Sequence, residues 1–300
     1  MKRIVYIIIS IAFYSCQSSQ PDFERSEIIV NNQRFEILTA YKIHENYIDN
    51  KNNYSRNVFK RIENEFGNNV EYPFLFDALK KEIKPDENLK EELKILKSSD
   101  FRLIIDSAYQ KITKALPGPD TKILFIPANP EYREMFRKYG TGMHAITVGT
   151  GKIIITIDPT FSNWKEQLLY ALAHEYHHSV WTSKKFKTSD FTPLEYIILE
   201  GKAESFAMGL FPNANHPFLN MLSKSEEKRI WNLIKPELNK RKSITTDKIF
   251  YGTNEIPYGS VYAIGYSIVE SFKKNNPEIK DNELIDISPE RILLLSNFEK

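Results

Sequence analysis

The chain has 300 residues and carries 41 Lys and Arg against 39 Asp and Glu, which gives a formal net charge of +2. This balance gives no reason to expect a nucleic-acid partner, and we expect none, since such proteins usually present a strongly basic surface. Hydrophobic residues make up 41% and aromatic residues 13% of the chain, which is ordinary for a globular protein and excludes long disordered regions. The length allows one large or two small domains with a buried core.

The first twenty residues differ in composition from the rest. Lys2 and Arg3 precede an apolar run over residues 4–14, and Ser15 and Cys16 follow that run. This order of charged, apolar and small residues is typical of a secretory signal peptide. The apolar run is also shorter than the about 20 residues that a membrane-spanning helix needs. We therefore expect residues 1–15 to be a signal peptide.

Cys16 is the only cysteine of the chain. Its place directly after a short export signal is similar to that of the lipidated cysteine in bacterial lipoproteins. We expect cleavage before Cys16, a lipid on this residue, and anchoring of the exported protein to a bacterial cell membrane or outer membrane, outside the cytoplasm. The alternative is cleavage and release without a lipid.

A tether and a helical region are expected next along the chain. Residues 16–53 are polar with one strand-like stretch at 34–41, and are interpreted as a lipid-anchored tether with an edge strand. Residues 54–116 form a helical N-terminal region, because apolar residues recur there at helical spacing. The helices are expected at 56–66, 73–83, 87–96 and 101–116.

A small sheet and a second group of helices follow. The Pro-Gly-Pro sequence at 117–119 marks a turn, after which there are three β-rich runs, at 123–126, 144–148 and 153–157. Helical periodicity returns from residue 162 and is broken at 211–217, 242–257 and 275–282. These patterns predict an α+β fold that is mostly helical, with a small β-sheet before the helix described next.

The segment 164–181 contains the sequence His174-Glu175-Tyr176-His177-His178, which includes H-E-x-x-H. On a helix His174 and His178 lie one turn apart on one face, so both imidazoles can bind the same ion. Zinc accepts such ligands, and a catalytic zinc site has three protein ligands and a fourth position for water. Glu175 is placed to take the proton of that water as general base. The alternative is a chance match on an amphipathic helix.

A second helix offers the missing third ligand. Its start is marked by residues 192–195, Thr-Pro-Leu-Glu, which supply an N-cap, a proline at the first helical position and a capping box. Glu200 and Glu204 follow on this helix among apolar residues. Two buried carboxylates on one face repel each other unless a cation compensates them, which zinc and a zinc-bound histidine would do. The alternative is a solvated acidic stripe.

H-E-x-x-H, then 21 residues, then Glu-Gly-Lys-Ala-Glu at 200–204 resembles the gluzincin metallopeptidases. More narrowly, the chain resembles the YjaZ-like predicted zinc-dependent proteases (domain of unknown function 2268), which show a β-hairpin, an A-H-E-Y-H-H helix, an E-G-x-A-E helix and a late helix with Gly-Tyr, here at 265–266. The resemblance covers roughly residues 123–298. It implies one Zn²⁺ held by His174, His178 and Glu200, and a zincin-like metallopeptidase domain over residues 117–300. It also implies that Glu204 is the partner of a ligand histidine, and that Gly201 lets the two active-site helices approach closely.

The helix expected at 259–274 offers a donor for the oxyanion that forms during peptide hydrolysis. Tyr262 and Tyr266 lie one turn apart on it. The sequence Tyr262-Ala263-Ile264-Gly265 is similar to the Tyr-x-x-Gly that carries this donor in the aminopeptidase branch of the gluzincins. We therefore choose Tyr262, with Tyr266 as the alternate. The alternative is that both are structural aromatic residues.

The remaining histidines are not expected to bind the metal. His177 shares a face with His174 but does not complete the motif, so it is interpreted as a residue behind the ligands or on the surface. The others have no companions at ligand spacing, and structural or exposed roles are expected for His44, His144 and His216.

These observations predict a zinc-dependent peptidase whose peptide or protein substrate lies along a strand of the 123–157 sheet. The alternative is a zinc-binding lipoprotein without proteolytic activity that acts as a peptide-binding or chaperone module. Glu175 favours the peptidase, because metal binding alone needs no base beside the ligand. The sequence at 142–146 lacks the glutamate of the G-x-M-E-N strand of aminopeptidases, so amino-terminal trimming has no support.

Overall fold

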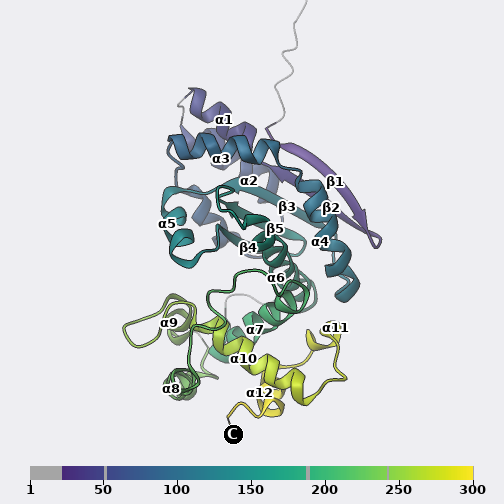
Figure 1. The fold of residues 1–300 in the computed structure, drawn as a ribbon, viewed down its shortest axis with the longest axis vertical. Helices are drawn as coiled ribbons and strands as arrows, with labels where there is room; N and C mark the ends of the chain where they lie inside the picture. Colours follow the sequence, from purple (N-terminus) through teal and green to yellow (C-terminus); the bar gives the residue numbers. More distant parts are fainter. Residues whose placement is uncertain (1–21, 51–52, 187–189, 242, 300) are drawn as a thin grey trace, which may run out of the picture.

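The computed structural model describes residues 22–50, 53–186, 190–241 and 243–299, and Figure 1 shows how their helices and strands are arranged. The fold is α+β and mostly helical, as predicted. Within the described ranges, we find no helix with the length and apolar character needed to cross a membrane.

Five strands form one mixed sheet in the order β1-β2-β3-β5-β4. The three central strands run parallel to one another, whereas each outer strand pairs antiparallel with its neighbour. Strands β3 and β5 are almost continuously apolar, which is typical of strands covered on both faces, whereas β2 also carries polar residues. The strand bounds are β1 Glu24–Val30, β2 Gln33–Thr39, β3 Thr121–Pro127, β4 Met143–Gly149 and β5 Lys152–Ile157.

The strand expected at 34–41 is present as β2, but the prediction that it forms an edge is wrong. It lies inside the sheet, between β1 and β3. The sequence of β1 resembles a polar tether, because only Ile28 and Val30 turn toward the core while their neighbours are exposed. Asn31 and Asn32 form the hairpin turn with φ angles of 48° and 64°, the left-handed backbone that such two-residue turns require.

The predicted helices of the N-terminal region are all present, and two further helices accompany them. Residues 55–66 contain a π-helical turn followed by a regular helix, and residues 73–80 form a 3₁₀ helix. Helices α1 and α5 were not predicted from the sequence. The bounds are α1 Tyr41–Asn50, η1 Ser55–Phe59, α2 Lys60–Phe66, η2 Pro73–Lys80, α3 Glu87–Ser98, α4 Phe101–Ala115 and α5 Pro130–Tyr139.

The C-terminal part is helical from residue 164, as predicted. A short helix, α9, lies within the break expected at 242–257. The bounds are α6 Trp164–Lys185, α7 Pro193–Leu210, α8 Lys224–Ile234, η3 Lys235–Glu237, α9 Thr245–Tyr251, α10 Ser260–Asn275, α11 Asp281–Leu284 and α12 Pro289–Ser296.

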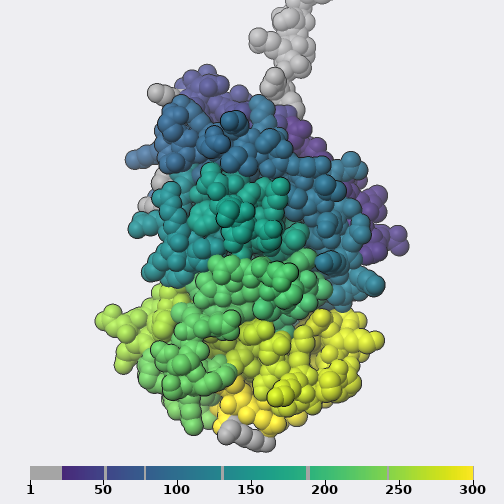
Figure 2. All heavy atoms as spheres, in the orientation of Figure 1, coloured from purple at the N-terminus to yellow at the C-terminus, as the bar shows by residue number. Residues whose placement is uncertain are grey.

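The described residues form two hydrophobic cores. The first joins the sheet to the N-terminal helices and α6, and includes Phe35, Tyr109 and Tyr176. The second lies among the C-terminal helices and includes Ile197 of α7 and Ile264 of α10. In Figures 1 and 2 the sheet with its helices forms the upper part of the molecule and the C-terminal helices form the lower part. Helices α6 and α7 therefore meet at the boundary between the two cores.

Two glycines bring α7 and α10 into backbone contact. A Cβ on Gly201 would lie 2.2 Å from the Gly265 carbonyl oxygen, and a Cβ on Gly265 would lie 2.2 Å from the Ile197 carbonyl oxygen. The absence of a side chain at Gly201 therefore allows the close approach of α10, and not that of the histidine helix α6. The expectation that Gly201 lets the two active-site helices, α6 and α7, approach each other closely is therefore wrong.

Candidate metal centre

Helix α6 carries both histidines of the motif at the boundary between the two cores. One side of the helix packs against the sheet through fully buried residues such as Leu168, Leu172 and Tyr176. His174 and His178 lie one turn apart on another side, and their Nε2 atoms are 3.0 Å apart. The packing of α6 thus fixes the direction in which both imidazoles point.

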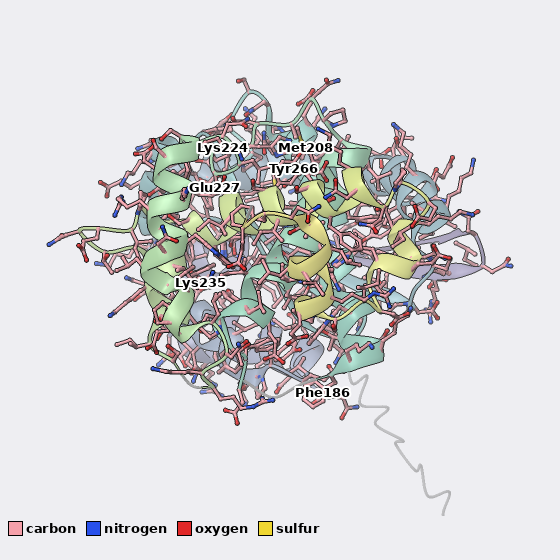
Figure 3. The ribbon with its side chains drawn as sticks, turned by 90° about the horizontal axis from the view of Figure 1, so that it is seen from below. Phe186, Met208, Lys224, Glu227, Lys235 and Tyr266 are labelled. Carbon is pink, nitrogen blue, oxygen red and sulfur yellow. The ribbon has the colours of Figure 1, made fainter. Side chains whose placement is uncertain are left out.

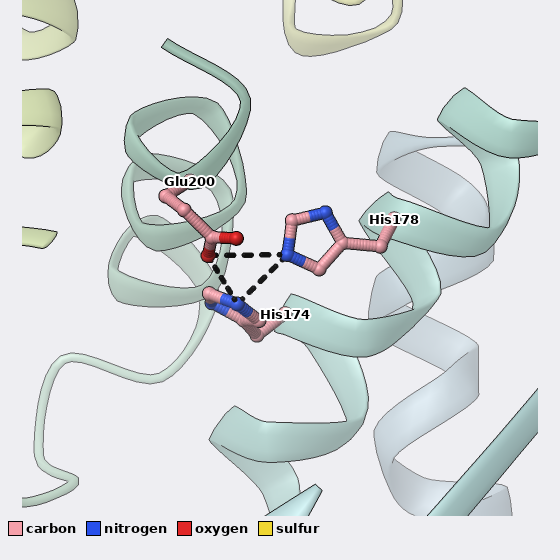
Figure 4. A group of neighbouring side chains, drawn as sticks. All are labelled: His174, His178 and Glu200. Carbon is pink, nitrogen blue, oxygen red and sulfur yellow. Dashed lines mark hydrogen bonds and ion pairs between the residues drawn. The ribbon is translucent and has the colours of Figure 1, made fainter. Parts of the chain in front are cut away.

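Helix α7 brings the carboxylate. Its start is fixed by the predicted capping box, in which the Thr192 hydroxyl accepts from the Glu195 N–H and the Glu195 carboxylate accepts from the Thr192 N–H. Glu200 Oε2 lies 3.3 Å from His174 Nε2 and 3.4 Å from His178 Nε2 (Figure 4). Of the His, Cys, Asp and Glu side chains described, these three form the group that could hold a metal ion.

The geometry of this group fits zinc. Three ligands at about 2.0 to 2.1 Å from a tetrahedral ion lie roughly 3.3 Å from one another, and the three observed separations are 3.0, 3.3 and 3.4 Å. The donor set of two imidazole nitrogens and one carboxylate oxygen is also one that zinc accepts.

Glu200 and the neighbouring histidines shift each other's pKa values toward the charged forms, as the values for Glu200 and His178 show. Burial alone would raise the pKa of Glu200, but His178 and His174 hold that pKa well below its usual range. Burial would lower the pKa of His178, but Glu200 raises it. The carboxylate is thus kept charged in a buried position, where a cation stabilises it.

Glu204 lies behind His174. Its Oε1 atom is 3.3 Å from His174 Nδ1, although the two do not have the geometry of a hydrogen bond. Burial raises the pKa of Glu204 to about 8. The carboxyl group is therefore within reach of the ring nitrogen that faces away from Glu200, as expected of a partner that orients a ligand histidine.

Glu175 points toward the edge strand β4. The Thr147 hydroxyl lies 2.8 Å from Glu175 Oε2 and 2.7 Å from the Glu175 main-chain oxygen, so it fixes the carboxylate. Thr147 was not identified from the sequence. The sequence places Thr147 on the buried side of a strand whose residues alternate between two faces. Only the fold shows that this side faces α6.

The two candidate tyrosines differ in position. The ring of Tyr262 lies 6.2 Å from the His174 ring, centroid to centroid, and Tyr262 lines the cavities on both sides of the ligands. Tyr266 lines neither of these cavities, and Figure 3 shows it on the underside of the C-terminal helices. The position of Tyr262 is therefore the one suited to an oxyanion donor.

A third tyrosine, Tyr196, lies close to the ligands. Burial, and then the charge of Glu200, raise the pKa of Tyr196 well above its usual value. Tyr196 stands four residues before Glu200 on α7, a spacing that places both on one side of the helix. This spacing is a signal in the sequence that could have identified it.

The other histidines have separate places. His177 is buried against Phe206, with ring centroids 5.8 Å apart, so it is not a surface residue. His44 is buried and its Nδ1 lies 2.7 Å from the Ala40 carbonyl oxygen. His144 and His216 are half-buried and line the cavities beside the ligands.

The candidate ligands lie beside two neighbouring cavities that share lining residues. A large cleft of about 1130 Å³ extends past His178 and is lined mainly by aromatic and apolar residues. A small pocket of about 140 Å³ lies on the side of His174 and Glu204. The two cavities share Ala145 of the edge strand as well as Glu175 and Tyr262. A continuous groove therefore follows β4 across the candidate metal centre.

Cys16, the expected lipidation site, lies outside the described residues.

Comparison with known proteins agrees with the candidate metal centre. No curated protein and no solved structure matches the chain. Residues 101–294 match the family described as Predicted Zn-dependent protease (DUF2268), and this segment begins with α4 and includes every candidate site residue of α6, α7 and α10. Because the match covers nearly two thirds of the chain, the protein belongs to this family of predicted Zn-dependent proteases.

Proposed function

We propose that this protein hydrolyses peptide bonds with one zinc ion held by His174, His178 and Glu200, and with Glu175 as general base. Bound zinc in such a site activates water as a nucleophile and stabilises negative charge on a carbonyl oxygen. The observation that carries the proposal is the convergence of the three ligand atoms beside Glu175, in a groove that follows an edge strand.

The protein's own residues have distinct tasks in this mechanism. Glu175 accepts a proton from the attacking water and passes it to the leaving amine, while the Thr147 hydroxyl keeps the carboxylate oriented. Glu204 orients His174 through the ring nitrogen 3.3 Å away. The phenol of Tyr262 donates a hydrogen bond to the oxyanion as it develops.

The edge strand β4 offers a backbone template for an extended substrate. The Gly142 carbonyl, just before β4, accepts a hydrogen bond from the N–H of Asp158, just after β5, and hydrogen-bonded pairs alternate along an antiparallel ladder. Residues Met143, Ala145 and Thr147 therefore direct their N–H and C=O groups away from β5. A peptide that adds to this edge passes directly over the candidate metal centre.

We also propose that the mature protein is exported and anchored to a bacterial membrane through lipid on Cys16. This proposal rests on the order of charged, apolar and small residues in the first sixteen positions. Replacing Cys16 by serine should move the protein from the membrane to the soluble fraction and reduce its mass by that of the lipid. Unchanged partitioning and mass would contradict the anchor.

The decisive experiment on the mechanism is Glu175→Gln. The amide fills the same space and still accepts from Thr147, but it cannot take a proton from water. We expect this variant to keep one zinc ion and the wild-type melting temperature, and to lose hydrolysis of an unbiased peptide mixture. The matched control is Glu166→Gln, an exposed glutamate on the same helix, which should leave activity unchanged.

The result also separates the peptidase from a peptide-binding protein without proteolytic activity. Wild-type protein that binds zinc and peptides but cleaves none would favour the binding protein. Undiminished cleavage by Glu175→Gln would exclude Glu175 as the base.

A further inference from the structure

The small pocket beside His174 differs chemically from the large cleft. It contains several polar groups that are buried and have no well-formed hydrogen bond within the protein, namely Gln167 Nε2, Tyr170 Oη and the ring nitrogens of His216, one of which lies near the Phe211 main chain. All three residues line the pocket. Leaving a buried polar group unpaired costs about 1 to 3 kcal/mol, so their collection in one pocket indicates a binding place for a polar group of a ligand.

These polar groups lie next to the candidate metal centre. Gln167 and Tyr170 are on α6, two turns and one turn before His174 respectively, and the Tyr170 ring centroid is 6.4 Å from that of His174. The His216 ring packs on Tyr170 at 4.1 Å. A substrate residue adjacent to the cleaved bond would therefore extend into this pocket.

The wall of the pocket opposite α6 is held in place. Asn215 donates hydrogen bonds to the carbonyl oxygens of Tyr139 and Gly140, at 3.3 Å and 3.0 Å, which ties the segment after α7 to the loop before β4. His216 follows directly in the chain. The pocket is thus formed by α6 on one side and an anchored loop on the other.

The charged groups that line the pocket favour binding of an uncharged side chain. Its lining contains the carboxyl groups of Glu175 and Glu204 but no lysine or arginine. Burial lowers the pKa of His216, although the Phe211 carbonyl opposes this shift, so the ring is neutral at pH 7. Apart from the proposed zinc ion, which Glu200 and the two histidines already hold, a carboxylate would find no cationic side chain to compensate it and would face two carboxyl groups, which is unfavourable.

The pocket offers both donors and acceptors, and its size limits the ligand. A phenol and a neutral imidazole can each donate and accept, and the Gln167 amide nitrogen donates. The volume of about 140 Å³ limits the ligand to a small group such as one side chain. A carboxamide side chain both donates and accepts and is of about this size.

We propose that the small pocket binds the carboxamide side chain of a glutamine or asparagine that flanks the cleaved bond of the substrate. This inference rests on the proposed peptidase function and names its substrate class. Gln167, Tyr170 and His216 are then specificity-determining residues.

The first test compares peptides that differ at one residue beside the cleaved bond. Glutamine, glutamate and methionine have similar size and differ in charge and hydrogen bonding. We expect wild-type protein to cleave the glutamine peptide with a kcat/KM roughly 10- to 100-fold above that of the methionine peptide, because two to three hydrogen bonds are lost with methionine. The glutamate peptide should be cleaved no better than the methionine peptide. A preference for methionine or glutamate would overturn the proposal.

Two variants connect the preference to the pocket. Tyr170→Phe removes only a hydroxyl, and Gln167→Met replaces the amide by an apolar group of similar volume. Each should reduce the preference for glutamine several-fold, mostly by weakening the glutamine peptide. The control is Tyr196→Phe, a matched change in the large cleft, which should leave the ratio between the two peptides unchanged. An unaltered ratio in both pocket variants would show that the preference arises elsewhere.

The second test does not depend on catalysis. Peptide hydroxamates bind zinc directly, and pairs with a glutamine or a methionine side chain beside the hydroxamate, on either side, can be titrated into zinc-loaded protein by calorimetry. At least 10-fold tighter binding of one glutamine probe, lost in Tyr170→Phe, supports the pocket even if no peptide is cleaved. In that case the peptidase proposal fails and the pocket assignment stands. Equal binding of both probes would mean that only water occupies the pocket, and the inference would be wrong.

Discussion

Replacing Gly201 by alanine tests how the crossing of α7 and α10 builds the site. The new Cβ would lie 2.2 Å from the Gly265 carbonyl oxygen and 2.7 Å from Gly265 Cα. Both obstructing atoms belong to the backbone, so no side-chain rotation relieves the clash. Ordinary contact begins at 3.4 Å, so the two helices must separate by about 1 Å.

Two effects of opposite sign decide the stability of this variant. Alanine favours a helix over glycine by about 1 kcal/mol, whereas forcing extra volume into a tight contact costs about 1 to 3 kcal/mol or more. Because backbone meets backbone here, we place the clash at or above the upper end of that range and expect a net loss of about 2 kcal/mol. For a chain of 300 residues that corresponds to a fall of about 3 °C in Tm.

The variant should also lose activity, because α10 carries Tyr262. A displacement of about 1 Å at a reacting group costs up to about 100-fold in rate. The measurements are thermal unfolding, zinc content and kcat. The matched control is Gly209→Ala on the same helix, where a Cβ meets nothing within 4 Å, and stability should rise by up to about 1 kcal/mol. If Gly201→Ala is as stable and active as Gly209→Ala, the close crossing of α7 and α10 is wrong.

Three further predictions concern the metal and its surroundings. Glu204→Ala should weaken zinc binding by roughly 10- to 100-fold, measured by competition with a chelator, whereas Glu200→Ala should weaken it far more; equal losses would contradict the separate roles of the two carboxylates. Tyr262→Phe should keep zinc and stability but lower kcat by about 10² to 10³ with little change in KM, and Tyr266→Phe should be nearly silent; the reverse result would transfer the role to Tyr266. Removing zinc with a chelator should lower Tm, and restoring it at 100 times its Kd should return about 2.7 kcal/mol of stability; a Tm independent of zinc would argue against binding to the folded state.

The group of side chains that could hold a metal could be predicted because its signals are local in the sequence. His174 and His178 lie one helical turn apart, and the capping box at Thr192 fixes where the next helix begins. The resemblance to a known family then singled out Glu200. None of these steps required knowledge of which segments pack together.

The parts that could not be predicted depend on contacts between distant segments. Thr147 reaches Glu175 only because β4 lies at the sheet edge beside α6. The partner of Gly201 is a backbone carbonyl more than sixty residues away. Helix α5 is mostly polar and β1 has few buried positions, so neither shows a clear apolar pattern.

The two edge strands of the sheet, β1 and β4, differ in charge, and this difference affects how the protein avoids self-association. The outer strand β1 carries exposed charged residues that form ion pairs, such as Arg25 with Glu36 and Glu65. Charged edges of this kind resist pairing with strands of other molecules. The residues of β4 that direct backbone groups outward are Met143, Ala145 and Thr147, which have no charge to repel another strand. The feature that would let β4 receive the proposed substrate therefore also makes it the edge more exposed to aggregation, and an occupied groove should protect the protein against it.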